Sequence, residues 1–394
     1  MNHNFLKLAL SLCITGFTAM QARSQTTEPI NVVTTAVPFL RISPDARSGG
    51  MGEVGIATTA DVNAPFLNLA KTPFNTSKGA IGLTYTPWLK RLGLNDVYMV
   101  TASGYGKIGD NDDQAISASL RYFNLGDIQF TDNQGNEFGS FRPREFSFDV
   151  GYSRKLSEKI GLGIALRYIY SNLAGGQNVN GTTYQAGNAV AGDITFYYNG
   201  TNAVGEGFSG GATATNLGTK IGYTTDATQK DFIPANLGLG GTYTKVFDES
   251  NKITFGMDFN KLMVPTPPAS GDSAGLAEYH SIPVVKSWFT SFSDAPGGFS
   301  EELREWTIST GIEYWYQDQF ALRTGYFYED KTKGNRQYFT VGMGIKYNVF
   351  GLNFSYIIPS GSGVNQNPLS NTLRLGLIFD LGGGDGKTGS SLNQ

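Results

Sequence analysis

The segment Ile160-Gly-Leu-Gly-Ile-Ala-Leu-Arg-Tyr-Ile-Tyr170 decides the fold class of this chain. Its even positions, from Ile160 to Tyr170, all carry large apolar or aromatic side chains. The positions between them carry mainly glycine, alanine and Arg167. Such alternation is typical of a membrane β-barrel strand, in which every second residue faces lipid and the others face the lumen. Folded as a helix, the segment would have apolar residues all round its axis, beside glycines that weaken helices.

The same alternation recurs in windows that begin at Phe146, Ile253, Trp306, Phe339 and Leu373. We therefore expect an all-β fold, a transmembrane antiparallel β-barrel of about fourteen strands, an even number as bacterial barrels require. The expected strands lie near 79–87, 96–105, 114–124, 145–154, 160–171, 189–199, 207–216, 234–245, 252–261, 304–316, 319–329, 337–348, 351–358 and 370–380.

The composition agrees with a barrel. The chain has 394 residues, of which 51 are Gly, 13% are aromatic and only 16% are charged. A disordered chain would be rich in charge and poor in aromatic residues, and a disulfide scaffold would need many cysteines, whereas this chain has one. The formal net charge of −3 gives no support for a nucleic-acid partner.

The N-terminal segment 1–24 reads as a secretory signal peptide. Lys7 precedes an apolar stretch from Leu8 to Met20, and Ala22-Arg23-Ser24 is a small-x-small cleavage signal. The alternative is a buried N-terminal helix. We expect export to the bacterial outer membrane, with the mature chain beginning at Gln25.

Connections between the expected strands alternate between short turns and long polar loops. Bacterial barrels place short turns in the periplasm and long loops outside the cell. Residues 25–78, broken by prolines and glycines, precede the first strand and are expected to form a hatch or plug inside the barrel at 79–380. The tail 381–394 is expected in the periplasm.

Several segments resemble a known family. Pro38-Phe-Leu-Arg-Ile-Ser-Pro-Asp-Ala-Arg-Ser-Gly-Gly-Met-Gly-Glu-Val-Gly-Ile-Ala57 resembles the N-terminal motif of the PorV (LptO) family of the type IX secretion system. Residues 88–96 and 190–198 also look like that family. The resemblance implies a carrier without enzymatic activity. It would receive cargo proteins bearing a C-terminal targeting domain from a SprA-like translocon pore and deliver them to a PorU-like sortase that attaches them to the surface.

The wider class is similar to FadL, a barrel with an N-terminal hatch. Its Asn-Pro-Ala hatch motif corresponds here to Asn68-Leu69-Ala70, with Leu69 in place of proline. Two other functions stay open: a FadL-like channel for hydrophobic compounds, and a lipopolysaccharide O-deacylase, which the second family name implies.

Three candidate sites have simpler explanations. Gly50-Met-Gly52-Glu-Val-Gly55 has the spacing of a dinucleotide motif but lacks the preceding strand, and we expect tight turns and no cofactor. Asp110-Asn-Asp-Asp113 falls on an expected turn and lacks a complete Ca²⁺ loop, so no metal is expected. His280 is the single histidine after residue 24, and no serine and acid are placed to complete a triad, so no catalytic residue is expected.

The loop 262–303 is the expected partner-binding element. It is longer than ordinary connections and opens with Pro265-Thr-Pro-Pro268. It then carries a cluster of apolar residues. The candidates are Ile282, Val285, Trp288, Phe289 and Phe292. Either the cluster docks a protein outside the cell, or it folds back over the barrel mouth as a lid.

Overall fold

The computed structural model describes residues 31–88, 96–131, 134–135, 137–179, 181–226, 229–268, 271–358 and 371–382. The predicted signal peptide 1–24 and most of the predicted tail 381–394 lie outside the described residues.

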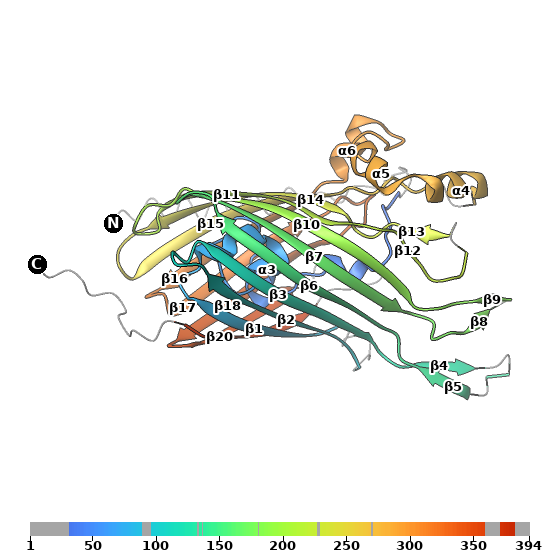
Figure 1. Cartoon of the computed structure of the whole chain (residues 1–394), viewed down its shortest axis with the longest axis horizontal. Helices are drawn as coiled ribbons and strands as arrows, with labels where there is room; N and C mark the ends of the chain where they lie inside the picture. Colours follow the sequence, from blue (N-terminus) through green and yellow to red (C-terminus); the bar gives the residue numbers. More distant parts are fainter. Residues whose placement is uncertain are drawn as a thin grey trace, which may run out of the picture. The chain divides into compact units, whose positions relative to one another are not determined.

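Fourteen antiparallel strands close into a barrel in which β20 pairs back onto β1 (Figure 1). The prediction of an all-β membrane barrel of about fourteen strands is confirmed. The barrel strands are β1 Gly79–Pro87, β2 Val97–Ile108, β3 Gln114–Leu125, β6 Arg144–Lys155, β7 Ile160–Asn172, β10 Gly187–Asn199, β11 Gly207–Gly218, β14 Asn236–Val246, β15 Asn251–Leu262, β16 Thr307–Tyr316, β17 Phe320–Tyr328, β18 Gln337–Tyr347, β19 Phe350–Ile358 and β20 Leu373–Asp380.

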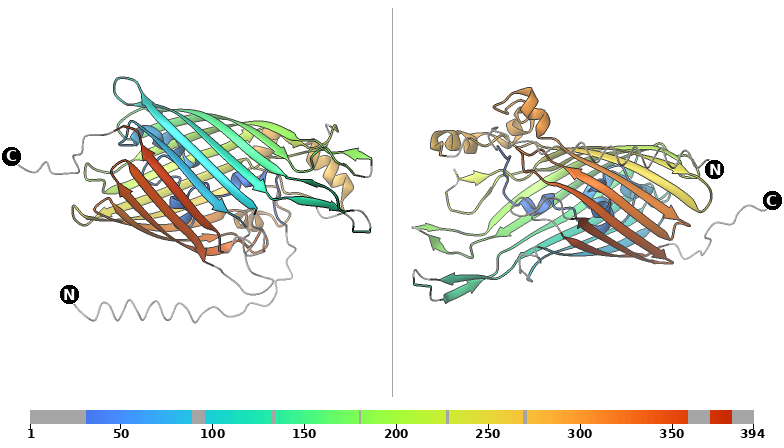
Figure 2. Two further views of the ribbon diagram at one scale, coloured as in Figure 1. Left: turned by 90° about the horizontal axis from the view of Figure 1, so that it is seen from below. Right: turned by 180° about the vertical axis from the view of Figure 1, so that it is seen from behind.

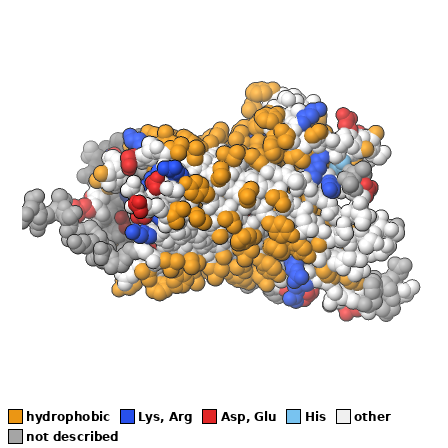
Figure 3. Space-filling view, in the orientation of Figure 1, with side chains coloured by type: hydrophobic (Ala, Val, Ile, Leu, Met, Phe, Trp, Pro, Cys, Tyr) orange, Lys and Arg blue, Asp and Glu red, His pale blue; other side chains and the backbone are white. Residues whose placement is uncertain are grey.

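Side-chain exposure follows the alternation of the sequence. In β7, Leu162, Ile164 and Leu166 are 41%, 60% and 72% exposed, whereas Arg167 is 3% exposed. The apolar residues of each strand thus face outward, and together they cover the barrel wall with a broad apolar surface (Figure 3). Among the described residues, no helix is long and apolar enough to cross a membrane.

The two rims of the barrel differ in their connections. One rim has tight turns, such as the turn between β18 and β19. The other has long connections that contain small hairpins and helices (Figure 2). These additional elements are β4 Ile128–Thr131, β5 Glu137–Phe141, β8 Asn178–Val179, β9 Thr182–Thr183, β12 Ile221–Gly222, β13 Lys230–Asp231, α4 Ser273–Ser281, α5 Val284–Thr290 and α6 Phe299–Arg304. By the rule for bacterial barrels, the rim with the long connections is the extracellular one.

The segment before β1 folds inside the barrel. Its short helices are η1 Pro38–Arg41, α2 Ala46–Gly50, α3 Ala64–Leu67 and η2 Leu69–Phe74. They lie within the ring of strands in both views of Figure 2. Most of residues 37–58 and 62–73 are buried, although no strand of the barrel includes them. We call residues 31–78 the hatch.

Candidate functional site

The helix α2 of the hatch begins at a capped turn. The Asp45 carboxylate accepts hydrogen bonds from the backbone N–H groups of Arg47 (2.8 Å) and Ser48 (2.9 Å), and from the Ser48 hydroxyl (2.5 Å). An aspartate at this position satisfies backbone donors that have no partner within the helix. The Asp-Ala-Arg-Ser part of the motif therefore fixes where α2 starts and which way Arg47 points.

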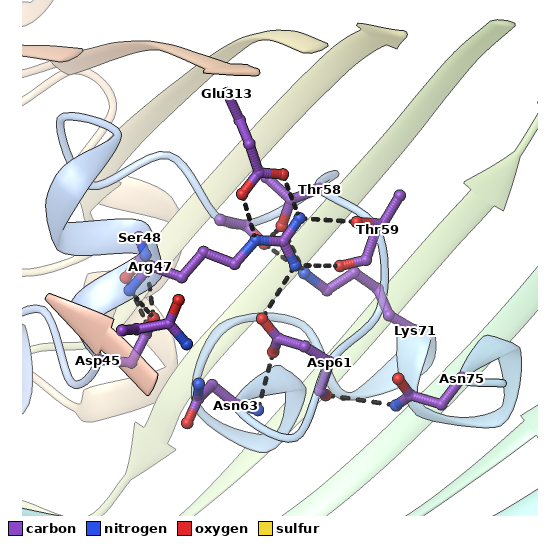
Figure 4. Close-up of polar contacts among 12 residues, drawn as sticks. Asp45, Arg47, Ser48, Thr58, Thr59, Asp61, Asn63, Lys71, Asn75 and Glu313 are labelled. Atoms are coloured by element: carbon purple, nitrogen blue, oxygen red, sulfur yellow. Dashed lines mark hydrogen bonds and ion pairs between the residues drawn. The ribbon is translucent and has the colours of Figure 1, made fainter. Parts of the chain in front are cut away.

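Arg47 joins the hatch to the barrel wall. Its guanidinium makes two hydrogen bonds to the Glu313 carboxylate of β16, at 2.9 and 2.7 Å. It also contacts Thr59 and the Asp61 carboxylate, the latter at 2.9 Å, so that it holds two parts of the hatch together (Figure 4). Glu313 is 1% exposed and also accepts a hydrogen bond from Arg323. Because the removal of one member of a buried ion pair leaves an uncompensated charge, this network holds the hatch strongly in place.

Gly52 lets the hatch touch the wall directly. Its φ of +67° favours glycine, and a Cβ atom there would lie 2.5 Å from the Tyr326 backbone nitrogen and 2.6 Å from the Thr310 carbonyl oxygen. The Thr340 hydroxyl accepts from the Gly52 N–H and donates to the Gly50 carbonyl. The predicted tight turns in Gly50-Met-Gly52 are therefore observed, and they serve hatch packing.

The Asn68-Leu69-Ala70 segment also fastens the hatch. The Asn68 amide donates to the carbonyls of Ile56 (3.0 Å) and of Phe196 in β10 (2.9 Å). Lys71 is 1% exposed and donates to the Gly55 carbonyl at 2.5 Å. Burial lowers the pKa of Lys71 to about 8, since desolvation disfavours its charged form.

The long connection between β15 and β16 is ordered at its base. Lys261 makes ion pairs with Glu302 (3.0 Å) and Glu305 (2.5 Å). Lys333, from the β17–β18 connection, pairs with Glu301 at 2.5 Å and with Glu305 at 3.0 Å. These contacts tie α6 and the residue after it to the end of β15 and to the β17–β18 connection.

A small apolar core supports α4 in the same connection. Tyr279 packs edge-on against Phe232, and Ile282 packs against this core from one side. The Lys220 ammonium donates to the carbonyls of His280 (2.7 Å) and Ile282 (2.8 Å). The loop is thus a folded element, which we call the α4–α6 platform (residues 263–306).

The predicted partner-binding residues separate into two groups on this platform. Ile282 is half-buried against the core below it, and Trp288 is also half-buried. By contrast, Val285, Phe289 and Phe292 are 59%, 74% and 37% exposed. A lid would bury its aromatic side chains against the barrel, and Phe289 is not buried in this way.

Sequence reasoning missed part of the exposed apolar surface of the platform. Phe299 and Leu303 on α6 are 78% and 56% exposed. Apolar side chains protrude beside the barrel wall where α5 and α6 lie (Figures 1 and 3). The helical spacing of Phe299 and Leu303, four residues apart, was a signal for them.

The other candidates occupy ordinary positions. His280 lies on α4 with its Nε2 atom 3.3 Å from the Asp231 carboxylate. Asp110–Asp113 forms the turn between β2 and β3. Within the described parts of the chain, no group of three or more His, Cys, Asp or Glu side chains is arranged to hold a metal ion.

A closed antiparallel barrel of fourteen strands with an apolar outer wall is the architecture of an outer-membrane β-barrel protein. The family described as type IX secretion system protein PorV matches residues 24–269. The chain belongs to the PorV family. No curated protein matches the sequence.

Solved structures are similar to this chain at low sequence identity. The toluene transporter TbuX of Ralstonia pickettii is similar with a TM-score of 0.50 at 10% identity, over 85% of this chain and 96% of that one. A TodX monoaromatic hydrocarbon channel variant is similar with a TM-score of 0.51 at 11% identity, over 85% and 97%. A Pseudomonas aeruginosa FadL homologue has a TM-score of 0.46 at 11% identity, over 89% and 99%.

Proposed function

We propose that this protein is the outer-membrane carrier of a type IX secretion system. It receives cargo with a C-terminal targeting domain from a SprA-like translocon pore and delivers it to a PorU-like sortase, without catalysing a reaction itself. The observation that carries the proposal is membership of the PorV family over residues 24–269.

The contacts that fasten the hatch in the lumen favour a carrier over a channel. The hatch is fastened by the Arg47–Glu313 ion pair and by the hydrogen bond from Asn68 to Phe196. A fixed hatch would block the passage that a channel needs. A carrier can keep its lumen closed, because its cargo binds to its outer surfaces.

The α4–α6 platform supports a protein-docking surface. Its base is held by buried ion pairs, so little conformational entropy would be lost on binding. Its exposed side chains include Phe289, and large aromatic residues are frequent energetic anchors in protein interfaces. The proposed docking set is Ile282, Val285, Trp288, Phe289 and Phe292, with Phe299 and Leu303 beside it.

Affinity purification tests the proposal. The protein carrying a C-terminal tag is extracted in mild detergent from its own host and its partners are identified by mass spectrometry. We expect a translocon pore protein, a sortase and cargo with C-terminal targeting domains. Recovery of none of these, from membranes in which they are present, would contradict the proposal.

A channel for hydrophobic compounds is the second candidate, because the structural neighbours include a toluene transporter and a monoaromatic hydrocarbon channel. Uptake of radiolabelled toluene by cells with and without the protein distinguishes the two. The carrier proposal expects equal uptake. Lipopolysaccharide O-deacylation is the third candidate. It would require that deletion of the gene changes lipid acylation and that the His280→Ala variant shows the same change.

We also propose that segment 1–24 is removed on export. N-terminal sequencing of the protein from outer membranes should begin at Gln25. A sequence beginning at Met1 would contradict the cleavage.

A further inference from the structure

A cavity of 410 Å³ lies above the hatch at the rim with the long connections. We call it the vestibule. One wall is apolar and aromatic, with Phe39 of the hatch, Trp88 after β1 and Phe123 of β3. The Trp88 and Phe123 rings meet edge-on, with centroids 6.1 Å apart. The volume falls within the range of small-ligand pockets, about 300–1,000 Å³.

A second wall is cationic. It carries four basic side chains and two carboxylates, a formal excess of two positive charges. These residues are Arg41, Lys333, Arg336, Arg374, Glu53 and Glu329. Three of the basic groups have carboxylate partners at hydrogen-bond distance: Arg336 and Arg41 bond to Glu329, and Lys333 pairs with Glu301.

Arg374 differs from the other three. It is 1% exposed, and its Nε and Nη1 atoms have no hydrogen-bond partner among the described residues. Its nearest carboxylate oxygen, on Glu53, is 4.0 Å from Nη2 and already accepts from the Tyr338 hydroxyl at 2.6 Å. A buried guanidinium whose donors are unused is costly, and an acceptor from a ligand would remove that cost.

The backbone around the vestibule is held in uncommon conformations. Val37 and Glu53 have φ angles of +47° and +73°, although neither is glycine. A β-branched residue such as Val37 rarely adopts a positive φ. Backbone strain of this kind concentrates at ligand sites. Gly49 makes room for the cationic wall, since a Cβ atom there would lie 2.8 Å from Arg374 Nη1.

We propose that the vestibule binds the carboxylate end of a ligand whose body is apolar. The carboxylate pairs with Arg374, and the apolar body lies against Phe39, Trp88 and Phe123. A guanidinium with unpartnered donors suits one singly charged acceptor, and a hydrogen bond from arginine to a carboxylate is strengthened by charge. The carboxylate could belong to the end of a peptide chain or to a fatty acid. The inference does not depend on the proposed secretion role.

Calorimetry on the purified full-length protein in detergent tests this site. The probes are an N-acetylated apolar tetrapeptide with a free C-terminal carboxylate, the same peptide as its C-terminal amide, and octanoate. We expect the free acid to bind at least about tenfold more tightly than the amide, because a charge-assisted hydrogen bond is lost with the amide. Octanoate that competes with the peptide would indicate a fatty-acid ligand, and octanoate that does not compete would indicate a peptide terminus.

Arg374→Gln should abolish the preference for the acid, while Arg154→Gln, at the opposite rim, should keep it. Gly49→Ala, which crowds Arg374, should weaken binding of the acid. Equal binding of acid and amide to the wild-type protein would overturn the proposal, and this comparison needs no variant. The absence of saturable binding of both probes up to about 1 mM, or an unchanged preference in a folded Arg374→Gln protein, would also overturn it.

Discussion

At the residue scale, buried charges decide how the hatch is held. Arg47→Met should loosen the hatch, because it leaves Asp61 and part of Glu313 without their cation. Breaking a buried pair of this kind costs about 3–5 kcal/mol. Hydrogen exchange followed by mass spectrometry should show faster exchange over residues 46–75, with the barrel strands unchanged.

The matched control for Arg47→Met is Arg142→Met. Arg142 pairs with Asp127, but their side chains are 56% and 44% exposed. An exposed pair contributes little to stability, so exchange over the hatch should not change. Equal exchange over residues 46–75 in Arg47→Met and wild type would mean that the ion pair does not hold the hatch.

A second prediction at this scale concerns the lipid-facing wall. Ile164→Lys should destabilise the folded barrel in bilayers by about 2–4 kcal/mol, because it places a charge in the apolar surface near mid-membrane. Leu156→Lys, in the exposed turn after β6, is the control and should have little effect. Urea titrations read by heat-modifiable gel migration measure both. A normal midpoint for Ile164→Lys would mean that this part of β7 does not face lipid.

At the element scale, the α4–α6 platform is expected to dock a partner. Replacing Trp288, Phe289 and Phe292 together by Ser should weaken binding of that partner by more than about 2 kcal/mol if they include an energetic hot spot. The measurement is recovery of partners on the tagged protein. Barrel assembly, judged by heat-modifiability, should not change.

The matched control replaces Leu156, Val204 and Phe247 by Ser. These three residues are 59%, 67% and 63% exposed and lie in turns of the opposite rim. The control should bind partners normally. Normal partner recovery with the platform variant would contradict docking through these residues, and loss of the folded barrel would place them in its core.

The barrel strands could be predicted from sequence and the hatch contacts could not, whereas the loop helices were missed although they left a signal. In β7 a lipid-facing wall imposes an alternation that can be read from neighbouring residues, and Arg167 falls on the lumen side as expected. The Arg47–Glu313 pair joins residues 266 positions apart, and no local pattern indicates that pairing. The helix α5 left a readable signal, since its apolar residues from Val284 to Trp288 follow helical spacing.

At the scale of the whole molecule, the barrel, the hatch and the platform are expected to serve different parts of one carrier function. We expect the barrel to anchor the protein in the outer membrane, the hatch to close the lumen, and the platform to meet partners outside the cell. The sequence predicted the barrel from the alternation along its strands, and the family from the motif at residues 38–57. The vestibule was not foreseen, because it is formed by residues as distant as Phe39 and Arg374.

The most direct test of the carrier role is the location of cargo in cells that lack this protein. Cargo with a C-terminal targeting domain is followed by surface labelling and fractionation in the deletion strain, the deletion strain with the wild-type gene restored, and the parent. We predict that cargo stays inside the deletion strain or leaves it unattached, and that the restored gene returns it to the surface. Normal surface attachment of cargo in the deletion strain, together with reduced uptake of toluene, would contradict the carrier role and favour a channel.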